Sequence, residues 1–176
     1  MHSARVNDFI GVVLAGGRSS RMGTNKAFLE YRGKPLIDHM MGLLKEADAK
    51  EVWVSGSLAG YPCIPDEEKF EGPAMAIRHV LKRLERADVS GVLFVPVDMP
   101  VMTPDLLREL AGQRDGAYYQ GWPLPAFLPF KEILPADKSI KGLLQVMRIS
   151  ARQVPEGRQA CFVNANTPEE WIEATG

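Results

Sequence analysis

"VVLAGGRSSRMGTNK" spans residues 12–26 and runs from an apolar segment into paired glycines and then into three basic side chains. The apolar part belongs to a strand predicted over residues 9–14, because β-branched side chains favour extended backbone. Gly16 and Gly17 allow the chain to turn sharply and to bring its N–H groups close to a bound anion, since glycine has no Cβ. The basic residues that follow are Arg18, Arg21 and Lys26. The stretch therefore predicts a strand followed by a loop that binds an anion such as a polyphosphate.

The rest of the chain alternates between short apolar runs and segments of helical periodicity. Further strands are predicted over residues 51–55 and 92–97, and the second is almost wholly apolar, as expected of a strand buried on both faces. Helices are predicted where apolar residues recur at intervals of three and four positions. Their apolar stripes begin at Leu36, Ile77, Leu106 and Ile140. This alternation is typical of βα units and predicts a three-layer α/β/α fold with a mainly parallel sheet, in a single domain over residues 1–176.

Three polar residues mark positions where helices should begin. Thr103 is followed by Pro104 and Asp105, which suit a first helical turn because proline lacks an N–H and a carboxylate favours the positive end of the helix dipole. Ser139 is the candidate N-cap of a later helix. Thr167 precedes a glutamate by three positions, which is the capping-box pattern and predicts a short terminal helix.

The region between residues 117 and 130 differs from these regular elements. It is rich in aromatic residues and proline, and it mixes strand formers with turn signals. We predict that it forms strands that cross the open end of the sheet.

Composition limits the classes of function. The formal net charge is -1, from 21 basic and 22 acidic side chains, so no overall field would attract nucleic acid or an anionic membrane. No apolar run approaches the roughly 18 residues needed to span a bilayer. Cys63 and Cys161 lie far apart and form no CxxC pair, which argues against a disulfide framework or a zinc site. We therefore expect a cytoplasmic protein that acts on small molecules.

Asp98, in the stretch LFVPVDMP, is the second candidate for chemistry because it directly follows the predicted strand over residues 92–97. Ligands of open α/β sheets bind beyond the carboxyl ends of the strands, so this carboxylate should face the same crevice as the glycine loop. A carboxylate near phosphates suggests Mg²⁺, which prefers a few carboxylates, waters and substrate phosphates. An aspartate that starts a turn before Pro100 is the alternative. The glycine loop matches neither the ATPase motif GxxxxGK[ST] nor the dinucleotide-binding motif GxGxxG. The alternative to anion binding is that the loop is only a connection whose charges are solvated.

Five segments, LAGGRSSRMGTNK, GKPL, DEEKFEGPAMAI, PVDMPVMTPDLL and FVNANTPEEW, span nearly the whole chain. Their content and order resemble those of the molybdenum cofactor guanylyltransferases. The resemblance implies a Rossmann-like fold of the nucleotide-diphospho-sugar-transferase type, with GTP as the donor and Mg²⁺ as the metal. It further implies transfer of GMP onto molybdopterin with release of pyrophosphate.

The same resemblance implies roles for individual residues. Lys26 matches the family lysine on the phosphates and Asp98 the metal ligand, and both would be catalytic. Arg21, a basic residue just beyond the glycine loop, would act with them by neutralising charge on the leaving pyrophosphate. The residues that bind the nucleotide would be Leu14, Ala15, Gly16, Gly17, Lys26, Ser55 and Asp66. Asn164 and Asn166 match paired asparagines at the pterin site, and amides suit the donor and acceptor pattern of a pterin ring.

Two other classes of function stay open at this point. The first is a sister nucleotidyltransferase that uses CTP or another NTP with a different phosphorylated acceptor; relatives that use CTP tend to read LAAG where this chain reads LAGG, which favours GTP. Ala76 replaces a glycine and Asn25 an aspartate of the family pattern, and either could alter specificity. The second is a non-catalytic nucleotide-binding partner for other proteins of cofactor assembly. The presence of Arg21, Lys26 and Asp98 together favours catalysis.

Overall fold

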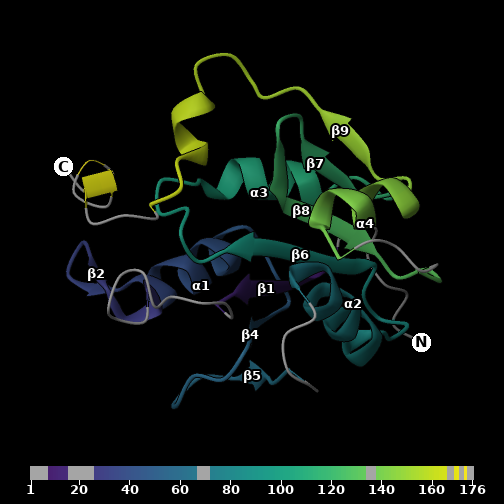
Figure 1. The fold of residues 1–176 in the computed structure, drawn as a ribbon, viewed down its shortest axis with the longest axis horizontal. Coiled ribbons are helices and arrows are strands. Elements are labelled where there is room, and N and C mark those ends of the chain that lie inside the picture. The colour runs from purple at the N-terminus through teal and green to yellow at the C-terminus, as the bar shows by residue number, and fades with distance from the viewer. Residues whose placement is uncertain are drawn as a thin grey trace.

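Strands and helices alternate along the chain (Figure 1). The computed structural model describes residues 8–15, 26–66, 72–133 and 138–165, together with residues 169, 170 and 173. The helices are α1 (Leu36–Glu46), α2 (Pro73–Leu84), α3 (Pro104–Ala111) and α4 (Ile140–Val146), with short 3-10 helices η2 (Lys26–Phe28) and η3 (Gln159–Phe162). The strands are β1 (Ile10–Leu14), β2 (Glu30–Tyr31), β3 (Lys34–Pro35), β4 (Glu51–Ser55), β5 (Cys63–Ile64), β6 (Gly91–Pro96), β7 (Ala117–Tyr119), β8 (Trp122–Pro129) and β9 (Ser150–Arg152).

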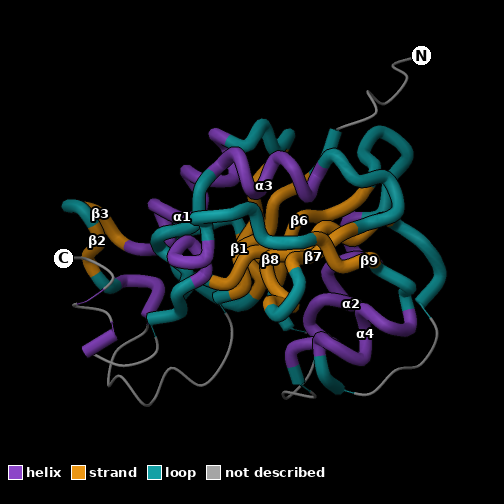
Figure 2. The backbone as a smooth tube through the Cα atoms, turned by 90° about the horizontal axis from the view of Figure 1, so that it is seen from above, coloured by secondary structure: helices purple, strands orange, loops and turns teal. Residues whose placement is uncertain are grey.

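Within the described residues, seven strands form one mixed sheet in the order β5-β4-β1-β6-β8-β7-β9. β1 runs parallel to both β4 and β6, β5 runs parallel to β4, and β9 runs parallel to β7. β8 is antiparallel to its neighbours β6 and β7. The pair α1 and α3 covers one face of the sheet, and the pair α2 and α4 covers the other (Figure 2). The predicted α/β/α fold with a mainly parallel sheet is therefore confirmed.

The predicted elements form close to their expected positions. β4 covers the predicted residues 51–55, and the bounds of β1 and β6 lie within one residue of the prediction. α3 begins at Pro104 with Thr103 at its N-cap position, as predicted. Among the described residues, however, the Thr103 side chain makes no capping bond, and its hydroxyl accepts a hydrogen bond from Arg158 instead. The capping box predicted at Thr167 lies outside the described residues.

Ser139 caps α4 as predicted, because the backbone N–H of Gly142 donates to its Oγ over 3.0 Å. Ser139→Ala removes this acceptor from the first turn of the helix. We expect the free energy of unfolding to fall by about 1 kcal/mol, the typical cost of losing an N-cap. Ser139→Thr keeps a hydroxyl and should restore most of the loss. Urea denaturation followed by circular dichroism measures both variants, and an unchanged midpoint for Ser139→Ala would contradict the prediction.

Residues 117–130 form a hairpin that extends the sheet, so the prediction that they cross its open end is wrong. β8 pairs with β6 from Gly91, opposite Pro129, to Phe94, opposite Ala126. The edge of β6 that faces away from β1 carries backbone groups that need partners, and β8 supplies them. Because β8 is antiparallel to β6, the first residues of β8 lie beside the carboxyl end of β6.

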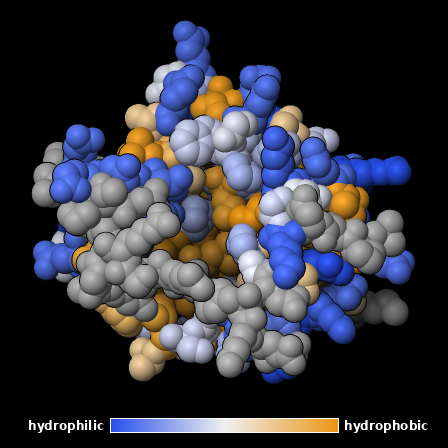
Figure 3. All heavy atoms as spheres, in the orientation of Figure 1, coloured by the Kyte–Doolittle hydropathy of each residue, from blue (hydrophilic) through white to orange (hydrophobic). Residues whose placement is uncertain are grey.

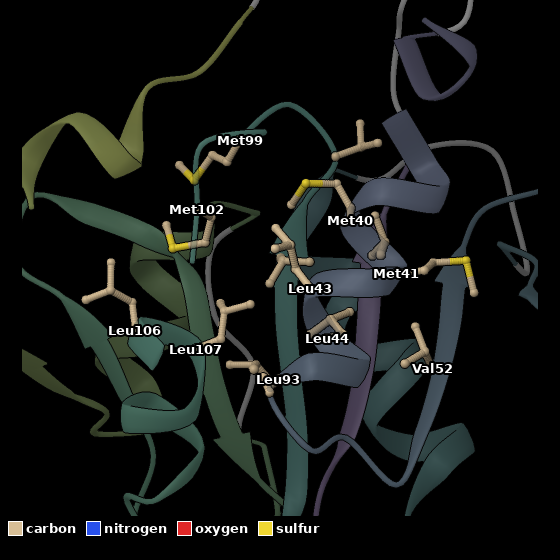
Figure 4. Close-up of a cluster of buried hydrophobic side chains, with 14 of the residues drawn as sticks. Met40, Met41, Leu43, Leu44, Val52, Leu93, Met99, Met102, Leu106 and Leu107 are labelled. Atoms are coloured by element: carbon tan, nitrogen blue, oxygen red, sulfur yellow. The ribbon is translucent and has the colours of Figure 1, made fainter. Parts of the chain in front are cut away.

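The helices bury apolar clusters against both faces of the sheet. Figure 4 shows part of the cluster beneath α1 and α3, where Met99 and Met102 from the loop after β6 lie above Leu106 and Leu107 of α3 and to one side of Met40 of α1. Met99 and Met102 are each 3% exposed. The loop that carries Asp98 is therefore anchored in the core. On the surface, apolar side chains are visible in a hollow near the middle of the view, with hydrophilic ones above it and to its right (Figure 3).

Both cysteines are free and partly buried in the structure. The Cys63 thiol contacts the backbone instead, because its Sγ donates to the carbonyl oxygen of Leu58 over 3.3 Å. Among the described residues, no helix combines the length and the apolar composition that crossing a membrane would require.

Candidate active site

The carboxyl ends of parallel strands meet at one edge of the sheet. Leu14 of β1 is in register with Ser55 of β4 and with Pro96 of β6, and Ser55 is in register with Ile64 of β5. The N–H of Ala15 donates to the Ser55 carbonyl oxygen over 3.3 Å, which extends the pairing one residue beyond β1. β4 lies on one side of β1 and β6 on the other, so the strand order reverses here. Such a switch point is where open α/β sheets bind their ligands.

Lys26 and Asp98 come together at this edge. Asp98 lies two residues beyond the end of β6, and Lys26 begins η2. Lys26 Nζ is 3.7 Å from Asp98 Oδ2, and the two side chains are only 18% and 19% exposed. Burial raises the pKa of Asp98 above its ordinary value, and the charge of Lys26 offsets part of the rise. The carboxylate is therefore poorly solvated and would be stabilised by a further cation.

Hydrogen bonds hold the Asp98 loop from three directions. The N–H of Val97 donates over 3.3 Å to the carbonyl oxygen of the last residue of β1. The carbonyl oxygen of Asp98 accepts a bond from the N–H of Ala165 at 2.9 Å. His39 Nε2, on α1, donates to the carbonyl oxygen of Pro100 at 2.7 Å. The position of the carboxylate thus depends on β1, on α1 and on the segment that follows η3.

The predicted site residues fall into three groups. The first group gathers around the ends of β1, β4 and β6 and comprises Leu14, Ala15, Lys26, Ser55, Asp98 and Asn164, the last through its neighbour Ala165. Asp66 alone forms the second group. Its side chain is exposed and lies two residues beyond the end of β5. β5 is separated from β6 by three inter-strand spacings, or about 14 Å. The third group lies outside the described residues and comprises Gly16, Gly17, Arg21 and Asn166.

Residues 11–126 match the family model of the MobA-like NTP transferase domain. The chain is a MobA-like nucleotidyltransferase. It is 36% identical to the molybdenum cofactor guanylyltransferase of Xanthomonas euvesicatoria pv. vesicatoria, in an alignment covering 92% of this chain and 91% of that protein. It is 38% identical to a probable molybdenum cofactor guanylyltransferase of Pelotomaculum thermopropionicum, over 93% of this chain and 90% of the relative. The resemblance inferred from the five segments is therefore confirmed.

Solved structures share the MobA-like fold over almost the whole chain. Rv0371c of Mycobacterium tuberculosis superposes with a TM-score of 0.73 at 21% identity and covers 94% of this chain and 97% of its own. Molybdopterin-guanine dinucleotide biosynthesis protein A of Archaeoglobus fulgidus gives a TM-score of 0.70 at 22% identity, with 94% and 96% coverage. A structure of Rv0371c in complex with manganese gives 0.65 at 18% identity, with 96% and 97% coverage. At these identities the likeness establishes the fold.

Two residues at this MobA-like site were missed by the sequence analysis. His39 holds the Asp98 loop through Pro100, from which it is 61 residues away, and no local pattern could reveal that contact. Glu170 carries a charge that helps to raise the pKa of Asp98, whereas its local sequence pattern indicates only the capping box predicted at Thr167. The His39 hydrogen bond and the Glu170 charge both act between segments distant in sequence, so only the fold brings them to the site.

Asp98 fits a magnesium ion that is held mainly by a bound substrate. Among the residues that the structure describes, no cluster of three or more His, Cys, Asp or Glu side chains could form a complete protein cage for a metal. Mg²⁺ does not need one, because it commonly binds one or two carboxylates together with waters and substrate phosphates. A buried carboxylate with a raised pKa, neutralised only in part by Lys26 at 3.7 Å, suits this mode of binding.

Burial of His39 predicts a pH dependence of stability. Burial lowers the pKa of His39 below its ordinary value of 6.5, and the charges of Lys34 and Arg32 lower it further. Below pH 6.5 the His39 imidazole binds a proton more readily in the unfolded chain than in the folded protein, so the free energy of unfolding falls as the pH decreases. Between pH 7.5 and pH 5.5 we expect the free energy of unfolding to fall less in His39→Gln than in the wild-type protein. Urea denaturation at several pH values measures this.

His79→Gln is the matched control, because His79 lies on α2, which covers the opposite face of the sheet from α1. It removes a histidine without touching the Pro100 carbonyl, so a change found in His39→Gln alone is assigned to the His39 site. Equal pH dependence in the wild-type protein and His39→Gln would contradict the prediction.

Proposed function

We propose that this protein transfers GMP from GTP to molybdopterin, releases pyrophosphate and so forms the guanine dinucleotide cofactor. The names of its relatives suggest these substrates. The observation that carries the chemistry is the partly buried pair of Lys26 and Asp98 beyond the end of β6, 3.7 Å apart. A cation and a metal-binding carboxylate at a strand edge suit a reaction in which negative charge accumulates on phosphates.

The reaction is an in-line displacement at the α-phosphorus of GTP. An oxygen of the terminal phosphate of molybdopterin forms a bond to this phosphorus as the bond to the β-phosphate oxygen breaks, and pyrophosphate leaves with the electron pair. A phosphate monoester is largely ionised near neutral pH, so no general base is required. Catalysis then consists of positioning the substrates and neutralising charge.

Each part of the site has a role in this proposal. Asp98 anchors Mg²⁺, which when bound supplies positive charge to the phosphate oxygens. Lys26 and Arg21 neutralise the charge that develops on the leaving pyrophosphate. The nucleotide lies along the edge of the sheet against Leu14, Ala15, Gly16, Gly17, Ser55 and Asp66. Asn164 and Asn166 bind the pterin ring of the acceptor through their amides.

The proposal extends to the metal and to the cellular setting. A relative of the same fold is described as a complex with manganese, and Mn²⁺ and Mg²⁺ share a preference for oxygen ligands. We assign Mg²⁺ to this protein on the chemistry of Asp98. We also propose that the whole chain acts as one domain, in the cytoplasm, and receives molybdopterin from other proteins of cofactor assembly.

Calorimetric titration with GTP, CTP and ATP in the presence of Mg²⁺ tests the choice of nucleotide. We expect selective binding of GTP, weakened in Asp98→Ala because the metal anchor is lost. Pyrophosphate release from GTP that depends on added molybdopterin then tests the transfer. Preference for CTP or ATP would assign the protein to a sister activity, and binding without pyrophosphate release would indicate a non-catalytic nucleotide-binding protein.

A further inference from the structure

Residues 158–165, here called the return segment, lead from the region after β9 to the Asp98 loop. The segment begins at Arg158, whose guanidinium donates to the Asp105 carboxylate at 2.8 and 2.9 Å and also to the Thr103 hydroxyl. Thr103 and Asp105 lie at the start of α3, just beyond the Asp98 loop. The first end of the return segment is therefore tied to the helix that follows Asp98.

The middle of the return segment is held by an aromatic stack. Phe162 is fully buried and stacks on Trp122 with a centroid distance of 5.5 Å and an interplanar angle of 28°. It also meets the edge of Tyr119 at 5.1 Å, and Tyr119 and Trp122 face each other across the β7–β8 turn. The Tyr119 hydroxyl in turn donates to the carbonyl oxygen of Leu106 on α3 at 3.1 Å. The stack joins the hairpin, the return segment and α3.

The last residue of the return segment, Ala165, is hydrogen-bonded to the Asp98 loop. Ala165 is fully buried, and its N–H donates to the carbonyl oxygen of Asp98 at 2.9 Å. Asn164 lies between this bond and the stacked Phe162 ring, two residues earlier. Two residues of chain span at most about 7 Å, so the backbone of Asn164 is fixed closely on both sides.

We propose that Trp122 is a positioning residue for the acceptor side of the site. Its stack on Phe162 fixes the return segment, and this holds the amide of Asn164 beside the Asp98 loop. This inference rests on the proposed function, in which Asn164 binds the heteroaromatic ring of the acceptor. Trp122 acts on the acceptor through Phe162 and Ala165, so its loss should leave the nucleotide side of the site unchanged.

Steady-state kinetics of Trp122→Ala and Trp122→Phe separate the two sides of the site. We expect Trp122→Ala to raise KM for molybdopterin at least tenfold and to change KM for GTP less than twofold. Trp122→Phe keeps an aromatic ring against Phe162 and should recover most of the affinity for molybdopterin. Trp53→Ala is the matched control, because Trp53 is also partly buried on a strand but lies on β4, where its indole donates to Glu51. It should change neither KM.

Hydrogen exchange of the Ala165 amide, followed by NMR in the substrate-free protein, provides a readout that does not need activity. We expect this amide to exchange at least tenfold faster in Trp122→Ala and at the wild-type rate in Trp53→Ala. Unchanged exchange, or an unchanged KM for molybdopterin in an active Trp122→Ala enzyme, would overturn the positioning role and leave the proposed function intact. A wild-type protein that transfers no GMP to molybdopterin would overturn the proposed function, and the role of Trp122 in acceptor binding with it.

Discussion

Asp98→Asn should lower the turnover number at least a thousandfold and at the same time stabilise the metal-free protein. The loss of activity follows because an amide binds Mg²⁺ much less well than a carboxylate, and charge neutralisation by a metal is worth several kcal/mol in the transition state. The gain in stability follows from the direction of the pKa of Asp98, which burial raises more than Lys26 lowers it. Pyrophosphate release and thermal unfolding measure the two effects.

The sign of the stability effect can be derived from proton binding. Between the ordinary pKa of 3.8 and the higher value in the folded protein, the folded state holds more protons than the unfolded chain, so stability falls as the pH rises. At neutral pH the ionised carboxylate is therefore destabilising, and an uncharged amide avoids that cost. We therefore expect the melting temperature of the metal-free protein to rise in Asp98→Asn.

Asp88→Asn is the matched control for both measurements. The Asp88 carboxylate accepts a hydrogen bond from Lys50 at 2.8 Å, and this bond lowers its pKa, so the direction is opposite to that of Asp98. Its loss should slightly destabilise the protein and leave turnover unchanged. Wild-type turnover in Asp98→Asn would refute the assignment of the metal anchor, and a lower melting temperature would refute the account of its burial.

Lys26→Met should lower the turnover number by about a hundredfold or more, since one well-placed charge or donor in the transition state is typically worth 10²- to 10³-fold. It should also move the acidic limb of the pH profile of kcat/KM to higher pH. The reason is that Lys26, 3.7 Å from Asp98, lowers the pKa of that carboxylate, and the profile reports groups of the free enzyme.

Lys26→Arg keeps the positive charge and separates the two effects of the substitution. It should leave the acidic limb near its wild-type position, whatever it does to turnover through its different geometry. If Lys26→Met kept wild-type turnover at saturating GTP and raised only KM, Lys26 would bind the nucleotide without taking part in the chemistry.

The regular part of the fold could be predicted from local sequence because its cause is local. The almost wholly apolar run at 92–97 had to be buried on both faces, and it forms β6 within one residue of the predicted bounds. The polar cap at Ser139 and the proline after Thr103 mark helix starts by the chemistry of the first turn. Asp98 could be assigned to the site because any residue just beyond such a strand lies at the ligand-binding edge.

Two features of the site were beyond local prediction. The position of the hairpin over residues 117–130 was predicted wrongly. Its aromatic and proline-rich composition indicates strands but not the strand that they pair with, which is set by the unpaired edge of β6. The role of His39 could not be predicted either, because it depends on a hydrogen bond to the carbonyl oxygen of Pro100, 61 residues away.

The sequence by itself thus determined the alternation of strands and helices, the family and most of the candidate residues, because periodicity, capping and motif spacing act over a few positions. Only the tertiary structure decided that Lys26 lies 3.7 Å from Asp98, and that Ala165 and His39 hold the loop around it. The pKa of Asp98 depends on the same packing, because burial is a property of all the segments that exclude water from the carboxylate.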